Sequence, residues 1–368
     1  MKEQTALIYC EGNFGDLDGK TANGLIRHSR KYEIMGVIDS HLAGRDSGMV
    51  LDGKKNEKKI YLDLTEAIRQ LGRTPVNFIF GLAPKEAFLS TEERRVILDA
   101  MDLGMNIVNG LHEFISEDKE FVQASKKNHV QIEDIRKPRP KRYLHLYTGA
   151  VRQVTIPRIA VFGTDCAVGK RTTALLLAKA LEGRGLKTLF IGSGQTALIQ
   201  GEKYGVAMDA MTSEFMTGEF EHAVLEGIRH ERPDVILIEG QSALSHPAFV
   251  STCAIIRGSV PDAIILQHPP KREIRVDFPA FSMPSVGEEI KLLESYSGVP
   301  VFAVTLNHEK MSLDEVNEAI ETYEQEYGVQ VTDPLIFGCD KLVDAVFRRF
   351  PALLEKQNTR VELSENKN

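Results

Sequence analysis

The stretch GTDCAVGKRT, residues 163–172, decides the fold of the second half of this 368-residue chain. It follows the apolar run Arg158–Phe162 and precedes the helix-forming segment TALLLAKALEGRG. A glycine-containing loop between a strand and a helix offers backbone N–H groups and the positive end of the helix dipole to an anion. Lysine adds a mobile positive charge. We therefore predict a phosphate-binding loop whose ligand-contacting residues are Gly163, Thr164, Asp165, Cys166, Ala167, Val168, Gly169, Lys170, Arg171 and Thr172.

This loop departs from the common phosphate-loop motif in two ways. Five residues separate Gly163 from Gly169, whereas the usual motif has four. The residue after Lys170 is Arg171 rather than the serine or threonine whose hydroxyl binds Mg²⁺ in that motif. Because a guanidinium cannot bind a metal ion, the loop favours phosphate binding and gives less support to metal-assisted ATP hydrolysis.

Outward from the loop, short apolar runs alternate with longer amphipathic segments, which is typical of parallel βαβ units. The predicted strands are Ala6–Cys10, Glu33–Ile38, Lys59–Leu62, Asn77–Gly81, Asn106–Asn109, Arg158–Phe162, Lys187–Gly192, Asp234–Glu239, Ala263–Gln267 and Val299–Leu306. Residues 117–157 become basic and proline-bearing, as a connecting segment does. We predict an α/β protein with mostly parallel sheets, divided into residues 1–136, a linker 137–157, a phosphate-loop domain 158–350 and a tail 351–368.

The composition is that of an ordinary globular protein, with 42% hydrophobic and 26% charged residues. The net charge of −7 gives no general attraction to nucleic acid, so an anion site must be local. Four scattered cysteines show no metal-ligand or disulfide spacing. No apolar run approaches the roughly 20 residues of a membrane span, and the N-terminus lacks a secretory pattern. We expect a cytoplasmic homo-oligomer without a metal, a nucleic-acid partner or membrane attachment.

Polar side chains follow the ends of the predicted strands, where ligands bind in doubly wound sheets. Glu239, His246 and His268 are the candidate acid–base groups, because each can take up a proton near the reacting atoms. Lys271 and Arg272 are either anion-binding groups or surface charges, and Asn307 follows the last strand where related loops often recognise adenine. The candidate substrate-binding residues at these ends are Gly194, Gln195, Thr196, Gln241, Ser242 and Ser245.

A second Gly-Lys-Thr occurs in GNFGDLDGKTANG, residues 12–24, but its glycine spacing fits no phosphate loop. The dinucleotide pattern GxGxxG is incomplete here, although Asp39 ends the next strand where a ribose-binding acid belongs. The stretch still follows a strand and opens a helix. The role of this loop stays open, and Lys20, Arg27 and Arg45 are alternative candidates for binding a substrate carboxylate.

The loop Gly163–Thr172, together with VILIEG at 235–240, resembles dethiobiotin synthetase. Residues 5–350 as a whole resemble a bacterial family that includes D-glutamate N-acetyltransferases. The stretches that carry this likeness are EGNFG (11–15), DGKTANG (18–24), VIDS (37–40), GTDCAVGK (163–170), GQT (194–196), EGQ (239–241) and LSHP (244–247). That likeness implies a Rossmann-like first domain and a phosphate-loop second domain.

The family likeness also implies a reaction, the transfer of an acetyl group from acetyl-CoA to the amine of a small acidic D-amino acid. The phosphate loop would then hold a coenzyme A phosphate, and Arg171 would need no metal beside it. His246, His268 or Glu239 would remove a proton from the amine. The dethiobiotin synthetase likeness implies the alternative, a ligase or kinase that uses ATP and Mg²⁺. A nucleotide sensor without catalysis is a third possibility.

Overall fold

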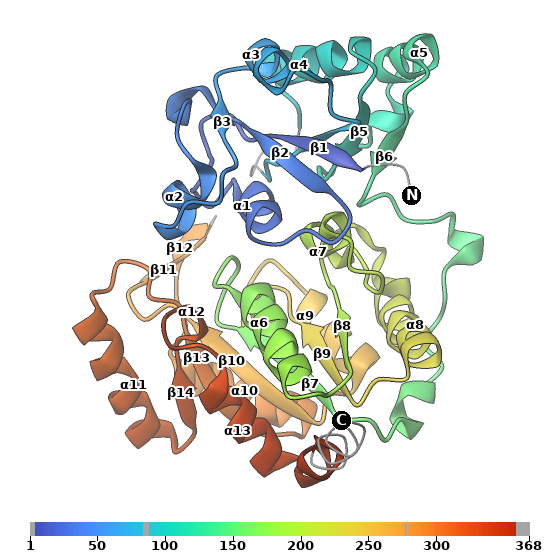
Figure 1. Ribbon diagram of the computed structural model, residues 1–368. Helices are drawn as coiled ribbons and strands as arrows, with labels where there is room; N and C mark the ends of the chain where they lie inside the picture. The colour runs from blue at the N-terminus through green and yellow to red at the C-terminus, as the bar shows by residue number, and fades with distance from the viewer. Residues whose placement is uncertain (1–3, 84–87, 277, 358–368) are drawn as a thin grey trace, which may run out of the picture. The chain divides into compact units, whose positions relative to one another are not determined.

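The computed structural model describes residues 4–83, 88–276 and 278–357. They form two compact units, each described by itself below. The first contains the chain up to Arg139 and the segment Gln195–Lys203, and the second contains Pro140–Gly194 and the chain from Tyr204 onward. Each unit is built on a parallel sheet with helices (Figure 1). The predicted α/β class with two mainly parallel sheets is therefore confirmed.

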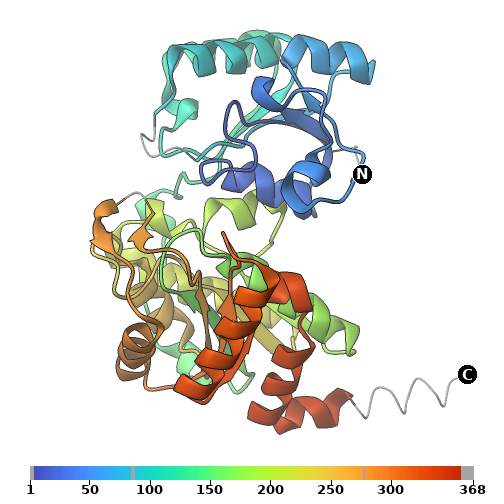
Figure 2. The same cartoon turned by 90° about the vertical axis from the view of Figure 1, so that its left-hand side faces the viewer.

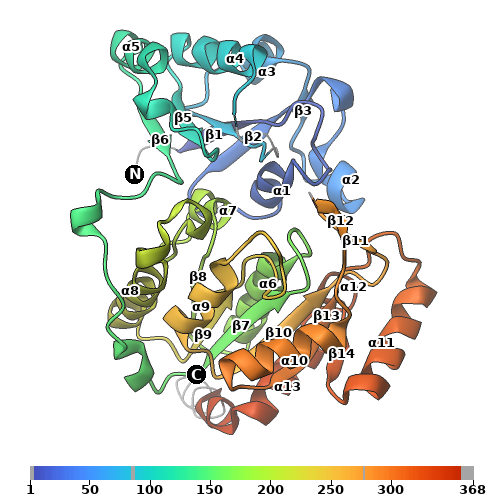
Figure 3. The ribbon, with the colours of Figure 1, turned by 180° about the vertical axis from the view of Figure 1, so that it is seen from behind.

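The sheet of the first unit has the strand order β3-β2-β1-β4-β5-β6 among the described residues, and every strand pair is parallel. Its strands are β1 (Thr5–Tyr9), β2 (Glu33–Ile38), β3 (Ile60–Tyr61), β4 (Asn77–Phe80), β5 (Asn106–Asn109) and β6 (Ile132–Asp134). Its helices are α1 (Lys20–Arg27), α2 (Ser47–Asp52), α3 (Leu64–Leu71), α4 (Thr91–Asp102), α5 (Lys119–Asn128) and α7 (Gln195–Gln200). Helices α1 and α7 cover one face of the sheet, and α3, α4 and α5 cover the other (Figures 1 and 3).

Helix α7 packs in the first unit although its residues fall within the range 158–350. The hydroxyl groups of Thr21 and Thr196 lie 3.0 Å apart. Gln200 donates hydrogen bonds from Nε2 to the backbone oxygens of Gly24, at 2.7 Å, and His28, at 2.9 Å. Ile199 is fully buried in the hydrophobic core of the first unit. The chain therefore leaves the second unit after Gly194 and returns to it at Tyr204.

The second unit has the strand order β14-β13-β10-β7-β9-β8, again parallel throughout. Its strands are β7 (Arg158–Gly163), β8 (Thr188–Ile191), β9 (Val235–Glu239), β10 (Ala263–His268), β13 (Val301–Leu306) and β14 (Gln330–Thr332). Its helices are α6 (Lys170–Gly183), α8 (Ser213–Glu231), α9 (Ser251–Ser259), α10 (Val286–Ser297), α11 (Leu313–Tyr327), α12 (Pro334–Phe337) and α13 (Asp340–Arg349). Helices α6 and α13 lie on one face of the sheet, and α9 and α10 lie on the other (Figures 1 and 3).

Three strand features escaped sequence reasoning. The edge strands β6 and β14 have only three residues each and lack a long apolar run. A hairpin of β11 (Ile274–Arg275) and β12 (Phe278–Ser282) follows β10, and it is drawn in orange (Figure 2). Most of β12 is exposed, so burial imposes no alternation of apolar and polar residues on it. In the part of the chain that the structure describes, no helix is long and apolar enough to cross a membrane.

Part of the predicted linker 137–157 is tied to helix α8. The carboxylate of Glu219 accepts a hydrogen bond from the backbone N–H of His145 at 2.6 Å, and that of Glu221 accepts one from Thr148 at 2.7 Å. A side chain at Gly218 would place its Cβ 2.2 Å from the His145 carbonyl oxygen, so only glycine permits this approach. The segment is thus anchored to the second unit by two buried acids.

Candidate functional site

The predicted phosphate loop connects the carboxyl end of β7 to the first residue of α6, Lys170. Gly169 has a φ of +107°, a conformation that glycine adopts without strain. A Cβ at Gly163 would lie 2.7 Å from Cγ2 of Val168 and 3.1 Å from Cδ of Lys170. Both glycines are therefore required by the geometry of the turn, the first by close packing and the second by its backbone angle.

Each of the five carbonyl groups from Thr164 to Val168 in this loop accepts a hydrogen bond from a side-chain donor. Thr164 O accepts from Arg275 at 3.1 Å, Asp165 O from Lys170 at 2.5 Å, Cys166 O from Arg272 at 2.8 Å, Ala167 O from Arg272 at 3.3 Å, and Val168 O from Asn307 at 3.1 Å. Among the described residues, no acceptor is bonded to the N–H groups of Cys166, Ala167 and Gly169. With the carbonyls held by donors and N–H groups left over, the loop has the hydrogen-bonding polarity of an anion cradle.

Lys170 is buried at the N-terminus of α6, and burial lowers the pKa of its ammonium group. The charges of Cys166, Asp165 and Glu239 act against that shift. Arg171 and Thr172 follow in the first turn, both half-buried. Both polar atoms of the Asn307 amide are hydrogen-bonded. Nδ2 donates to the backbone oxygen of Val168 in the loop, and Oδ1 accepts from the backbone N–H of Glu309 at 3.1 Å. In this arrangement the side chain of Asn307 supports the loop.

The side chain of Asp165, which is itself a residue of the loop, is fully buried. One carboxylate oxygen, Oδ2, accepts from the backbone N–H of Val276 at 2.8 Å and lies 3.4 Å from Nη1 of Arg272. The other, Oδ1, has no hydrogen-bond partner in the described part of the chain, although Nη1 of Arg275 lies 3.9 Å away and Nε2 of His246 lies 3.6 Å away. Asp165 is thus the centre of a buried group of charges.

His246 accepts a hydrogen bond in this arrangement. Its Nδ1 accepts from the backbone N–H of Ala248 at 3.1 Å, so the proton of the neutral imidazole lies on Nε2. The ring stacks on Phe249 with centroids 4.6 Å apart, and its side chain is 0% exposed. Since its lone pair is engaged and its ring is inaccessible, the geometry disfavours the predicted role as a general base. His246 instead presents Nε2–H toward Asp165.

His268 is a weak base. Burial, together with the charge of Arg272, lowers the pKa of its imidazole to about 4, and its Nδ1 lies 2.9 Å from the hydroxyl of Thr164. A group with this pKa is neutral at pH 7 and has little affinity for the proton of an ammonium group. The predicted role in proton removal is therefore disfavoured for His268 as well.

This shift predicts how stability depends on pH. Because the folded-state pKa lies below the ordinary value of 6.5, the stabilisation is present above pH 6.5 and is lost as pH falls toward 4. Urea unfolding at pH 7.5 and pH 5 should show wild type losing about 2 kcal/mol more than His268→Asn, whose side chain does not titrate there. An equal loss in the two proteins would contradict a depressed pKa for His268.

Glu239 remains as the candidate base whose side chain is suited to proton removal. It ends β9, and Oε2 accepts from the backbone N–H of Ser193 at 3.0 Å. A carboxylate has about four acceptor positions, so it can accept more than one hydrogen bond at a time. Near this strand end, three buried oxygens have no hydrogen-bond partner within the described residues: Ser193 Oγ, Gln241 Oε1 and Ser242 Oγ. These oxygens make the neighbourhood of Glu239 a candidate binding site for a substrate with hydrogen-bonding groups.

Three possible metal ligands also meet beside the loop, since ligand atoms of Asp165, Cys166 and His246 all lie within 4.8 Å of one another. A metal at this position would need the lone pair of His246 Nε2, which carries the proton. Arg272 and Arg275 also place two guanidinium groups beside the Asp165 carboxylate. The chemistry of these residues therefore fits a metal ion poorly.

The remaining predicted substrate residues divide between the two units. Gly194, half-buried, and Ser245, whose Oγ accepts from Arg275 at 2.8 Å, belong to the second unit with Gln241 and Ser242. Gln195 and Thr196 are buried in α7 of the first unit, and Lys20 and Arg45 are exposed there. The structure thus separates, by unit, residues that sequence reasoning had grouped as one substrate set.

Two backbone N–H groups of the Gly12–Gly24 loop in the first unit are bonded to nearby side chains. Its Phe14 N–H is bonded to Asp39 and its Gly15 N–H to Asn23, both at 3.0 Å. Burial and the carboxylates of Asp39, Asp16, Asp18 and Glu11 raise the pKa of the Cys10 thiol at this sheet edge. Engaged N–H groups and clustered acids do not suit phosphate, so this stretch differs in character from Gly163–Thr172.

Sequence reasoning missed Arg275 and the buried Glu289. Arg275 lies on the hairpin and reaches the loop only in the folded chain. Glu289 in α10 accepts from the backbone N–H of Leu244 at 2.7 Å and so supports the segment that carries Ser245 and His246. The only available signal was the position of Arg275 a few residues beyond the carboxyl end of β10.

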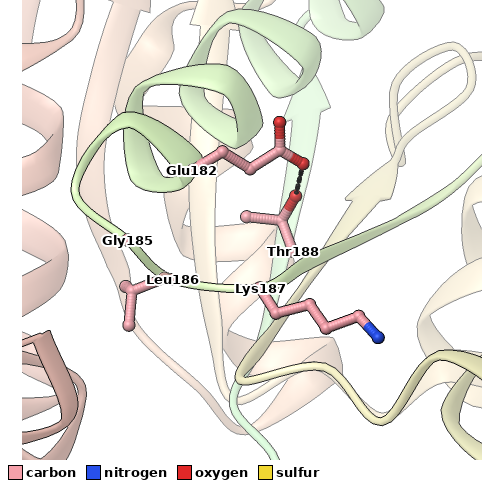
Figure 4. Close-up of a pocket in the computed structure, with 5 residues that line it drawn as sticks. All are labelled: Glu182, Gly185, Leu186, Lys187 and Thr188. Carbon is pink, nitrogen blue, oxygen red and sulfur yellow. Dashed lines mark hydrogen bonds between the residues drawn. The ribbon is translucent and has the colours of Figure 1, made fainter. Parts of the chain in front are cut away.

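A surface hollow at the other end of α6 is a poor candidate site (Figure 4). It is lined by Glu182, Gly185, Leu186, Lys187 and Thr188. Its side-chain hydroxyl and carboxylate satisfy one another, because Thr188 Oγ1 donates to Glu182 Oε1 at 2.6 Å. Ligand sites in parallel sheets lie at the opposite, carboxyl end of the strands, where the loop of β7 is found.

The fold and the site together define a phosphate-loop α/β protein that carries a Rossmann-like unit. A family model described as the DUF1611_C P-loop domain, a domain of unknown function, matches residues 145–343. The DUF1611_N Rossmann-like domain matches residues 40–138. The chain therefore belongs to the DUF1611 family, and the resemblance found in its sequence is confirmed.

Individual relatives agree with this assignment. The chain is 30% identical to a DUF1611 family protein from Anabaena variabilis, whose crystal structure superposes with a TM-score of 0.86 over 94% of this chain and 100% of that one. A D-glutamate N-acetyltransferase from a Pseudoalteromonas species is 33% identical over 72% of this chain and 80% of the relative. A protein of the same name from Tritonibacter scottomollicae is 28% identical over 73% of this chain and 80% of the relative.

Proposed function

We propose that this protein is an N-acetyltransferase that moves an acetyl group from acetyl-CoA to the amine of D-glutamate. The observation that carries the proposal is the phosphate loop itself. Within the described residues, the N–H groups of Cys166, Ala167 and Gly169 have no acceptor, and Arg171 stands in place of a metal-binding hydroxyl. The choice of D-glutamate as the acceptor of the acetyl group rests on two relatives named D-glutamate N-acetyltransferase.

The donor would be held by its phosphates. Coenzyme A carries several phosphate oxygens, which are suited to the loop N–H groups and to the ammonium group of Lys170. Binding a phosphate in this way needs no cleavage of it, so a position for Mg²⁺ is not required. The arm between the phosphates and the thioester is long and flexible, so the thioester can be placed away from the loop.

Glu239 would prepare the acceptor. The amine must lose a proton before its nitrogen can attack the thioester carbonyl, and the carboxylate of Glu239 accepts that proton. The new N–C bond forms as the C–S bond breaks, and coenzyme A leaves as a thiol. Gln241 Oε1 and Ser242 Oγ, both without partners in the described residues, would hold the acceptor through hydrogen bonds.

The proposal is tested with purified protein, acetyl-CoA and D-glutamate. We expect release of free thiol, measured with a chromogenic disulfide, and an acetylated product heavier by one acetyl group in mass spectrometry. L-glutamate serves as the matched control. Parallel reactions with ATP and Mg²⁺ report the ligase or kinase alternative through release of ADP. Absence of thiol release with D-glutamate and with a panel of other amino acids would overturn the proposal.

A further inference from the structure

We propose that Arg272 and Arg275 are positioning residues that form a latch behind the phosphate loop. They hold the carbonyl groups of the loop away from the ligand and thereby keep its N–H groups available to an anion. This inference rests on the proposed phosphate binding by the loop, but not on the identity of the acceptor. It differs from the alternative raised by the sequence, in which Arg272 binds the anion directly.

Arg272 joins two parts of the loop. Its Nη1 donates to Cys166 O at 2.8 Å and its Nη2 to Ala167 O at 3.3 Å. The same guanidinium lies 3.4 Å from Asp165 Oδ2, and Nη2 contacts Glu309 Oε2 at 2.6 Å. The fixed fork of an arginine provides several donors in one plane, so one side chain can restrain adjacent carbonyl groups.

Arg275 restrains the start of the loop. Its Nη1 donates to Thr164 O at 3.1 Å, and its Nη2 donates to Ser245 Oγ at 2.8 Å. Nη1 also lies 3.9 Å from Asp165 Oδ1. Arg275 therefore connects the loop after β7 to the segment after β9, while Asp165 lies between the two guanidinium groups.

The charges of this latch are balanced internally. Arg272 and Arg275 are both buried, and the carboxylates of Asp165 and Glu309 accompany them. Two positive and two negative groups leave no excess charge for a phosphate. The positive charge available to a phosphate comes from Lys170, and the positive end of the α6 dipole adds to it. The arginines consequently act through the loop backbone and not as anion ligands.

The neighbouring Lys271 offers a matched control. It is exposed and forms a surface ion pair with Glu315. Exposed pairs of this kind contribute little to stability. A Lys271→Met variant removes a positive charge one residue from Arg272 without touching a loop carbonyl.

The test measures binding and turnover separately. Binding of inorganic pyrophosphate and of acetyl-CoA is followed by calorimetry in wild type, Arg272→Met, Arg272→Lys, Arg275→Met and Lys271→Met. Loss of charge-assisted hydrogen bonds predicts about 10- to 100-fold weaker binding of both probes to the two methionine variants of arginine. Arg272→Lys should lie between them and wild type, because it restores charge without the fork. At saturating acetyl-CoA, kcat should stay within about threefold of wild type, since the reacting groups are intact.

Hydrogen exchange distinguishes a positioning role from general destabilisation. The N–H groups of Thr164 and Val276, which donate to Gln267 O at 3.1 Å and to Asp165 Oδ2 at 2.8 Å, should exchange faster in the arginine variants, while those within β7 and β10 keep their protection. If Arg272→Met fails to fold, the same comparison is made with Arg272→Lys. A folded arginine variant that binds pyrophosphate as tightly as wild type would overturn the latch, and so would an equal loss in Lys271→Met.

The outcomes separate this inference from the proposed function. Wild type that binds pyrophosphate and loses this binding on Arg272→Met, yet releases no thiol from acetyl-CoA, supports the latch and rejects the transferase. Wild type that binds neither pyrophosphate nor acetyl-CoA overturns both.

Discussion

Replacement of Glu239 by glutamine should lower kcat for acetyl transfer by about 100- to 10,000-fold, the usual contribution of a positioned general base. Glutamine keeps the shape of the side chain and an oxygen that can accept the Ser193 N–H, so the end of β9 is preserved. The KM for acetyl-CoA should change little, because the loop that would hold the donor is untouched. Steady-state kinetics of Glu239→Gln against wild type check this expectation.

The pH profile of Glu239→Gln adds a second test. Without the carboxylate, the reaction depends on the fraction of acceptor that is already deprotonated in solution. The rate of the variant should therefore rise with pH by about tenfold per unit up to the pKa of the acceptor ammonium. Wild type should respond less steeply.

Glu221→Gln is the control for Glu239→Gln, because Glu221 is also a buried acid that accepts backbone N–H groups but serves to anchor the segment near Thr148. It should lower thermal stability and leave kcat within about threefold of wild type. A Glu239→Gln protein with wild-type kcat would show that proton removal does not depend on this carboxylate.

Replacement of Lys170 by alanine should weaken the binding of acetyl-CoA by about 10- to 100-fold through the loss of a charge-assisted hydrogen bond to phosphate. Alanine also removes the hydrogen bond from Nζ to the buried Asp165 carbonyl oxygen, so thermal stability should fall modestly as well. Calorimetric titration and thermal unfolding of the same samples measure the two quantities.

Lys179→Ala is the matched control for Lys170→Ala, because it removes an exposed lysine from the same helix α6. It should change neither affinity nor melting temperature appreciably. The transferase predicts that Lys170→Ala recovers turnover at high acetyl-CoA concentration. Complete loss of turnover at every donor concentration, with ADP release by wild type, would instead favour the ATP-dependent alternative.

The parallel α/β architecture could be predicted from the sequence because its signals are local. Apolar runs of strand length, such as Val235–Glu239, alternate with helix-forming segments, and this alternation fixes the class of fold. Glycines at residues 163 and 169, with Lys170 after them, locate the loop because the turn itself demands them. The short edge strands β6 and β14 could not be found in this way, since three residues are too few to establish a period.

The sequence by itself therefore determined the fold class, the position of the phosphate loop and the choice of Gly163–Thr172 over Gly12–Gly24. Only the tertiary structure decided which unit contains α7, that Arg275 reaches the Thr164 carbonyl, and that the His246 ring is buried with Nδ1 engaged. It also lowered the pKa of His268 and left Glu239 as the favoured base. These properties depend on burial and on contacts between residues distant along the chain, such as the 111 positions from Thr164 to Arg275. The local pattern of residues does not encode such contacts, whereas it directly reflects the backbone conformations that a strand, a turn and a helix require.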